Sequence, residues 1–448
     1  MPSLPRKIVN RLREQMALGT DRTREALPVF NRRLATGAGA ILLGLAALAF
    51  AKLGDLAQRG FLALETAWPW ATLIVTPLVF AGVVQTMRHW FPESRGSGIP
   101  QVIAAARDPE GTADGPLVSL RTAAAKISMT LAMLLAGGSV GREGPTVQLS
   151  AAIMVAVHRW LRVPISAGVL IAGGAAGVAA AFNTPLAGVA FAIEELASAY
   201  EQRIAVLVMA AVMIAGLVSL GIAGDYVYFG AMGQTLSLRA MLLVTPLAGV
   251  AGGLTGGLFS RIVLAFAAQT RAWMGRIRAH PVLFAGSCGL VVALLGLATH
   301  GSTWGTGYGA TRQLVEGHGQ SLWFGPAKFG AALATTLSGA PGGIFAPSLA
   351  VGAGLGNLLT PLFPNDSAGA IVELGMIAYF TGVVRAPLTA VIIISETTAS
   401  RGLIIPLFAA ALIADVVSAL VCRERLYHGL AKPFLTKSAG HDEEDRST

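Results

Sequence analysis

The sequence predicts an all-α polytopic membrane protein, and its composition provides the first two observations. Hydrophobic residues make up 54% of the 448 residues and charged residues only 13%, whereas an average soluble domain carries about 25% charged residues. So few charges cannot cover a surface that faces water, which excludes a soluble fold. Glycine is unusually frequent, with 54 residues, and it lets membrane helices approach one another closely. We therefore expect close-packed, interrupted membrane helices.

The third observation is an internal repeat, which appears when the chain is compared with itself at an offset of 202 residues. The coinciding pairs include Lys126 and Lys328, Gly141 and Gly343, Pro145 and Pro347, Pro185 and Pro387, and Glu194 and Glu396. At a slightly larger offset, Gly96-Ser-Gly matches Gly305-Thr-Gly. The pattern predicts two homologous halves, residues 34–230 and 236–430. Duplicated halves are typical of transporters, whose binding site lies at the repeat interface.

Two short polar segments flank the predicted halves. Residues 1–33 contain eight Lys or Arg residues against three acidic residues, and this basic flank predicts a cytoplasmic N-terminal segment. No cleavable signal is expected, because the first apolar run begins only at Leu34. The segment holds much of the net charge of +9, so we expect it to meet anionic lipid rather than nucleic acid. Residues 431–448 form a short C-terminal tail, which we also expect in the cytoplasm.

Three motifs rich in glycine and proline interrupt the apolar sequence, at residues 96–100 (Gly-Ser-Gly-Ile-Pro), 141–145 (Gly-Arg-Glu-Gly-Pro) and 342–347 (Gly-Gly-Ile-Phe-Ala-Pro). Proline suits the first turn of a helix and glycine allows a tight backbone before it, so each motif predicts a helix N-terminus at membrane depth. The free N–H groups of such an end attract anions. One motif alone is more often an ordinary kinked or loop-linked helix. Three of them, two at matching repeat positions, favour convergence on one anion.

Glu143 lies in the second motif. A charged side chain costs at least ~2.5–3.5 kcal/mol at the membrane centre, so a functional role is the default interpretation. At a helix N-terminus a carboxylate resembles a bound anion and competes for the same donors. The alternative is a salt bridge with Arg142, but adjacent residues of a helix do not face each other.

Further charged residues lie at the ends of apolar runs. Glu194 and Glu195 follow one such run, and an ordinary interfacial helix end is the alternative interpretation for the pair. Because Glu194 matches Glu396 in the repeat, we expect that position to be structural, whereas Glu195 has no acidic counterpart. Lys126 and Lys328 are expected either to attract anions into a vestibule or to extend from helix ends to the membrane interface.

The sequence predicts neither a cofactor nor a metal site, and it does not predict an enzyme. The histidines form no His-Glu-x-x-His pattern, and Cys288 and Cys422 have no metal-ligand spacing. Residues 137–141 do fit the hydrolase pattern Gly-x-Ser-x-Gly. That pattern requires a strand, a turn and a helix, with a histidine and an acid to complete a triad. An intramembrane hydrolase that uses Ser139 is therefore a minor alternative.

The three motifs, in this order, resemble those of the CLC chloride channel and transporter family. The similarity extends to residues 180–188, Glu194-Glu195, residues 385–389 and Tyr427, and so covers residues 34–435. Without the resemblance, Tyr427 would be interpreted as an interfacial aromatic residue. The resemblance implies two halves of inverted topology built from tilted, broken helices, and a homodimer with one pore per subunit.

The resemblance also implies a function, the exchange of chloride for protons across a prokaryotic cell membrane, with a passive chloride channel as the alternative. Glu143 would be the external gate and Glu195 the internal proton-transfer residue. The serine of the first motif favours chloride over nitrate, and the proline of the second separates the chain from fluoride exporters. The implied anion site consists of Gly96, Ser97, Gly98, Ile99, Ile344, Phe345 and Tyr427, with electrostatic support from Lys126, Arg142 and Lys328.

Overall fold

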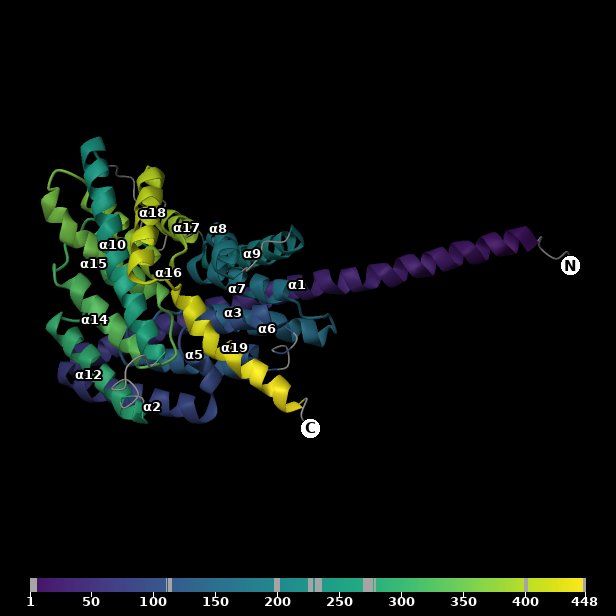
Figure 1. The fold of residues 1–448 in the computed structure, drawn as a ribbon, viewed down its shortest axis with the longest axis horizontal. Coiled ribbons are helices and arrows are strands. Elements are labelled where there is room, and N and C mark those ends of the chain that lie inside the picture. Colours follow the sequence, from purple (N-terminus) through teal and green to yellow (C-terminus); the bar gives the residue numbers. More distant parts are fainter. Residues whose placement is uncertain are drawn as a thin grey trace.

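The computed structural model describes the backbone of residues 6–109, 111, 115–196, 202–224, 229, 236–268, 277, 279–398 and 402–445. For residues 6–30, 202–204, 223 and 436–445 the structure describes the backbone alone. Every element of the described chain is helical, and the helices pack into one bundle from which the N-terminal part of α1 projects (Figure 1). The predicted all-α fold is confirmed.

Helices of very different length build the bundle. Among the described residues, seven helical segments are long and apolar enough to cross a membrane. The longest inner one, α10 (Leu238–Ala267), has 30 residues, or about 45 Å at 1.5 Å per residue. A hydrocarbon layer is about 30 Å thick, so α10 is longer than a perpendicular span requires. At the other extreme, α8 (Pro185–Phe191) has 7 residues and is too short to span.

The first half runs from α1 to α9. Its elements are α1 (Arg6–Ala67), η1 (Pro69–Ala71), α2 (Thr72–Trp90), η2 (Pro92–Ser94), α3 (Ile99–Arg107), η3 (Pro116–Val118), α5 (Leu120–Leu135), α6 (Glu143–Trp160), α7 (Ala167–Phe182), α8, the π-helical turn η4 (Ala192–Leu196) and α9 (Gln202–Ala223). The three short 3₁₀ turns, η1 to η3, each begin with proline, which has no N–H to leave unpaired there.

The second half runs from α10 to the C-terminal helix. Its elements are α10, α12 (Pro281–Ala298), α13 (Tyr308–Val315), α14 (Phe324–Leu337), α15 (Phe345–Leu359), η5 (Thr360–Leu362), α16 (Ala368–Val384), α17 (Pro387–Thr398), α18 (Ile404–Val421) and α19 (Leu426–Asp445). The order of long and short helices follows that of the first half, as the sequence repeat predicts.

Equivalent positions of the two halves meet at the centre of the molecule. Gly141 and Gly343 pair as an antiparallel bridge, and each N–H donates to the other carbonyl at 2.7 Å. The matched segments therefore run in opposite directions, which is the inverted arrangement. Asn183 and Arg385, another matched pair, share a left-handed backbone, with φ of 57° and 59°, and each ends its helix.

A reciprocal exchange of caps joins the halves a second time. The Glu194 carboxylate accepts hydrogen bonds from the N–H groups of Leu388 at 2.9 Å and Thr389 at 2.6 Å, in the first turn of α17. Glu396 does the same for α8, where Ala187 N–H donates to it at 3.1 Å. A carboxylate on a helix N-terminus is stabilised by the free N–H groups and the helix dipole. This geometry matches the structural role expected of Glu194.

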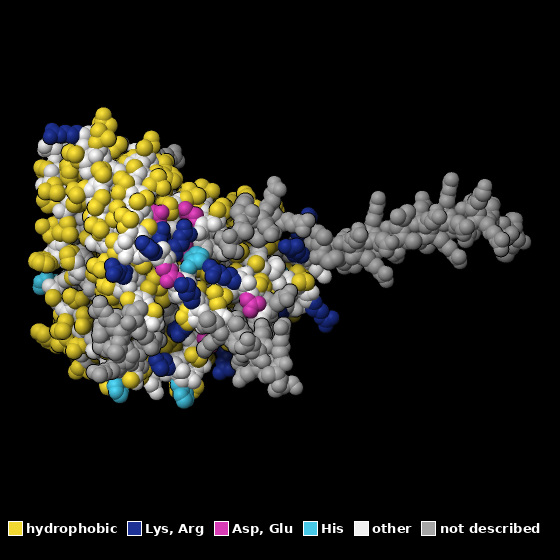
Figure 2. Space-filling model, in the orientation of Figure 1, with side chains coloured by type: hydrophobic (Ala, Val, Ile, Leu, Met, Phe, Trp, Pro, Cys, Tyr) yellow, Lys and Arg dark blue, Asp and Glu magenta, His cyan; other side chains and the backbone are white. Residues whose placement is uncertain are grey.

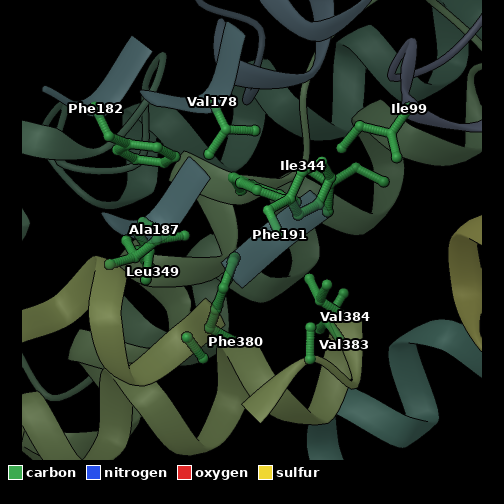
Figure 3. Packing of buried hydrophobic residues seen from close by; sticks show 14 of the residues in the cluster. Ile99, Val178, Phe182, Ala187, Phe191, Ile344, Leu349, Phe380, Val383 and Val384 are labelled. Carbon is green, nitrogen blue, oxygen red and sulfur yellow. The ribbon is translucent and has the colours of Figure 1, made fainter. Parts of the chain in front are cut away.

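Aromatic side chains from both halves pack around the start of α15. The Phe345 ring lies 5.0 Å from the Phe380 ring, 5.9 Å from Phe191 and 6.2 Å from Phe182, measured between centroids. Figure 3 shows part of this cluster, with Phe182 and Phe191 from the first half facing Phe380 from the second. The cluster fixes the N-terminus of α15 at the interface between the halves.

The surface divides into an apolar flank and a charged region. On the face shown in Figure 2, hydrophobic side chains cover the flank, whereas Lys, Arg, Asp and Glu side chains gather near the middle. Large apolar side chains are widely exposed, including Ile405 at 81% and Leu420 at 82%. Such a surface suits contact with lipid, which agrees with the prediction of a membrane protein.

Candidate anion and proton site

The three predicted helix starts are present, and they converge. Helices α3, α6 and α15 begin at Ile99, Glu143 and Phe345, each at its motif. The motifs touch through their backbones, since Gly342 N–H donates to Gly96 O at 3.2 Å. The first N–H groups of a helix have no partner within the helix. Three sets of such donors therefore face one region between the halves.

Two glycines make this close approach possible. Gly98 has φ of 108°, and a Cβ at that position would lie 2.7 Å from Gly144 O. A Cβ at Gly144 would lie 2.7 Å from the Ser97 carbonyl oxygen and equally close to its hydroxyl. Any larger residue would separate the first motif from the second.

Hydroxyl groups complete the convergence. Ser97 is 4% exposed and Tyr427, in the first turn of α19, is completely buried, so Tyr427 is not an interfacial aromatic. The Tyr427 ring centroid lies 6.0 Å from that of Phe345, and its buried hydroxyl has no hydrogen-bond partner among the described residues. The structure thus places Tyr427 beside the start of α15, and both belong to the anion site that the resemblance implies.

A cavity of ≈ 480 Å³ leads to this point. Gly96, Ser97 and Ile344 line it together with Arg88 and Phe434. The cavity therefore borders the first and third motifs, and its lining includes Arg88 and Arg95 as well as Glu93. A positive potential in such a cavity raises the local concentration of anions.

Glu143 is completely buried at the start of α6. Its Oε2 accepts a hydrogen bond from the N–H of Ala346 at 3.4 Å, in the first turn of α15. Its Oε1 accepts a hydrogen bond from the Tyr308 hydroxyl. The carboxylate of one half thus rests on the helix N-terminus of the other half, where an anion would find the same donor.

Tyr308, at the start of α13, is a functional candidate that the sequence interpretation missed. The repeat contained the signal, because Gly305-Thr-Gly-Tyr308 corresponds to Gly96-Ser-Gly-Ile99. The two turns are built alike: Ile99 N–H donates to the Ser97 hydroxyl at 3.4 Å, and Tyr308 N–H donates to the Thr306 hydroxyl at 3.4 Å. The turn in the second half therefore places a phenol where the first half has an isoleucine.

Arg142 binds helix α1. Its Nη1 donates to the Ala51 carbonyl at 2.7 Å and to Asp55 Oδ1 at 2.8 Å, both in α1. The guanidinium also lies 5.6 Å from the centroid of the Tyr308 ring. The hydrogen bonds described for Arg142 thus lie in α1, and those described for Glu143 lie at Tyr308 and Ala346.

Lys126 and Lys328 occupy neither of the expected environments. Both are completely buried, so neither lies in an open vestibule or extends to the membrane interface. Lys126 Nζ donates to Gly96 O at 3.0 Å, and Lys328 Nζ donates to Gly305 O at 2.7 Å. Each lysine holds the carbonyls of one Gly-x-Gly turn. A buried ammonium needs such acceptors, and these bonds fix the turns that carry Ser97 and Tyr308.

Glu195 lies on the π-helical turn η4 and points away from Glu194. Its side chain is completely buried, and Oε1 lies 3.3 Å from Nδ1 of His428 in α19. π-Helical turns are rare and occur often at functional sites. On this turn, Glu194 caps α17 and Glu195 contacts α19. His428 is the second residue that the sequence interpretation missed, and only its position next to Tyr427 pointed to it.

The hydrolase alternative has no structural support. Ser139 follows helix α5 instead of a strand, and its N–H donates to the Thr335 hydroxyl at 3.3 Å. Gly-x-Ser-x-Gly nucleophiles require a strand before the turn. Over the described part of the chain, no group of three or more His, Cys, Asp or Glu residues is placed to hold a metal ion.

Comparisons with known proteins agree with this geometry. The family model described as "Voltage gated chloride channel" matches residues 79–419. The chain is 32% identical over 429 residues to the "H(+)/Cl(-) exchange transporter ClcA" of Yersinia pestis bv. Antiqua (strain Angola), a match that covers 89% of this chain and 86% of that protein.

Solved structures show the same fold. A "slow cyanobacterial Cl-/H+ antiporter" superposes with a TM-score of 0.76 at 22% identity, over 90% of this chain and 98% of that one. A "CLC-type fluoride/proton antiporter" superposes with a TM-score of 0.73 at 22% identity, over 87% and 95% of the two chains.

Proposed function

Because the chain belongs to the voltage gated chloride channel family, as its motifs predict, we propose that it exchanges chloride for protons across a cell membrane. The observation that carries the proposal is the position of Glu143. Its carboxylate takes the Ala346 N–H at the start of α15, a donor that a chloride ion would use. A single group that is both proton acceptor and anion competitor links the two fluxes.

Neutral donors hold the anion in this proposal. The N–H groups of Ile344 and Phe345 and the hydroxyls of Ser97 and Tyr427 supply partial positive charge. Helix N-termini stabilise an anion by fractions of a charge. Lys126 is not needed as a direct ligand, since its ammonium is engaged with the Gly96 carbonyl at 3.0 Å. The anion is therefore bound weakly enough to be released, which a transport cycle requires.

Proton binding releases the gate. The charged Glu143 carboxylate is stabilised by the Tyr308 hydroxyl and by Ala346 N–H. Protonation removes the charge that these donors stabilise, so the side chain leaves and an anion takes its place. Each cycle of anion entry is coupled in this way to proton uptake or release at Glu143.

Protons reach Glu143 from the opposite side through Glu195. Glu195 is buried on η4, which follows the C-terminal end of α8, whereas the carboxylate of Glu194 caps α17. A buried acid that caps nothing is available for proton transfer. Water carries the proton between Glu195 and Glu143 in this proposal. The sequence predicts no other acidic residue in the apolar runs near these two glutamates.

The relatives support exchange in preference to the alternative, a passive chloride channel. The proposal places both termini in the cytoplasm of a prokaryotic cell, on the side of His428 and Glu195, and assigns the active form as a homodimer with one pathway per subunit. The protein acts as a transporter and not as an enzyme.

The test is reconstitution of the full-length protein in liposomes, with chloride and proton fluxes recorded together. We expect an outward chloride gradient to drive protons uphill into the vesicles. Chloride flux that proceeds with no proton movement under the same gradient would establish the passive channel instead.

A further inference from the structure

The contact between His428 and Glu195 has no place in the mechanism so far. We infer that His428 is the proton donor that loads Glu195 from the cytoplasmic side, an inference that rests on the proposed function. The imidazole is 29% exposed, whereas the Glu195 side chain is completely buried. The ring therefore spans the distance between solvent and the buried carboxylate.

The polar side chain in contact with the Glu195 carboxylate is His428. The distance from Nδ1 to Oε1 is 3.3 Å. Across the described chain, neither oxygen of Glu195 meets hydrogen-bond criteria with any protein donor. Nδ1 is itself buried, so one edge of the ring faces the acid and the ring as a whole still reaches solvent. A proton from water can thus arrive by crossing a single side chain.

The other charged groups of this region have separate partners. Both oxygens of Glu194 bind the start of α17. Arg425 donates to the Glu194 backbone oxygen at 3.1 Å and acts on Glu195 only through its charge. Lys432 pairs with Glu424 at 2.5 Å. None of these groups connects Glu195 with water. Among the described residues, His428 is therefore the titratable side chain that lies between Glu195 and solvent.

The chemistry suits a relay. An imidazole ring can take up a proton at one nitrogen and release a proton from the other, which is what a proton shuttle requires. In the transfer step the Nδ1–H bond of the imidazolium breaks and an O–H bond forms on Glu195 Oε1, which leaves a neutral ring and a neutral acid. Water then reprotonates the ring before the next transfer, and no other reactant is required.

The decisive variant is His428→Asn, because asparagine keeps a hydrogen-bond donor beside Oε1 but cannot titrate. Proton and chloride fluxes are recorded together in liposomes at pH 7.5. Positioned acid–base groups contribute a hundredfold or more, so we expect proton flux to fall at least about tenfold while chloride flux stays within about twofold. His280→Asn, a change at an exposed histidine that precedes α12, is the matched control and should leave both fluxes unchanged.

The pH profile separates a relay from a structural role. Wild-type proton flux should decline as the cytoplasmic pH rises, and this decline should be weaker in His428→Asn. Proton flux within twofold of wild type in His428→Asn would overturn the inference, as would loss of chloride binding together with both fluxes, since His428 would then support the fold alone. A wild-type protein that moves no protons would refute the proposed function itself, which is a separate result.

Discussion

Replacing Tyr308 with phenylalanine removes one hydroxyl from the carboxylate of Glu143 and changes little else. The hydroxyl donates to Oε1, so after the change Ala346 N–H is the remaining donor, at 3.4 Å. A hydrogen bond to a charged group contributes about 1.5–3 kcal/mol. Since 1.36 kcal/mol corresponds to one pH unit, the charged gate should be displaced at an external pH about one to two units higher.

Chloride flux against external pH measures this shift directly. Losing the hydroxyl weakens the charged, closed gate, so the midpoint of the flux profile should move upward and flux at pH 7 should rise. Tyr379→Phe is the matched control, because Tyr379 is another fully buried tyrosine and no contact joins it to Glu143 among those described. A midpoint that moves by less than about 0.3 unit in Tyr308→Phe would refute the assignment of Tyr308 to the gate.

Three further changes test other parts of the site. Tyr427→Ala should weaken chloride binding measured by calorimetry, and unchanged affinity would exclude Tyr427 as a ligand. Gly98→Ala should cost about 1–3 kcal/mol in a thermal unfolding assay, because its φ is 108° and the added Cβ would meet Gly144 O. Gly82→Ala, inside helix α2 with open space around it, should be neutral or stabilise the protein by up to about 1 kcal/mol. A crosslinked dimer with one disabled subunit should keep about half the flux, and complete loss would rule out independent pathways.

Glycine and proline spacing made much of the fold predictable. Three motifs that combine glycine with a proline in the first turn of a helix located the starts of α3, α6 and α15 to within about two residues. The repeat offset also paired Gly141 with Gly343, and the structure joins these two residues by hydrogen bonds. Local backbone demands of this kind are visible in a single sequence.

Side-chain direction was not predictable in the same way. Tyr308 and Glu143 are 165 residues apart, and nothing local indicates that they meet. For Lys126 and Lys328, a charge in an apolar sequence suggests solvent, whereas both lysines bind carbonyls inside the protein. The partner of Arg142 lies in α1 for the same reason. Contacts of this kind depend on the packing of whole helices.

The central claim is that Glu143 couples the two fluxes by competing with the anion for the start of α15. The most direct measurement is the simultaneous recording of proton and chloride fluxes in liposomes that contain Glu143→Ala. Because alanine neither binds a proton nor occupies the Ala346 N–H, chloride flux should continue while proton movement and dependence on pH disappear. Protons still driven uphill by a chloride gradient in this variant would contradict the claim.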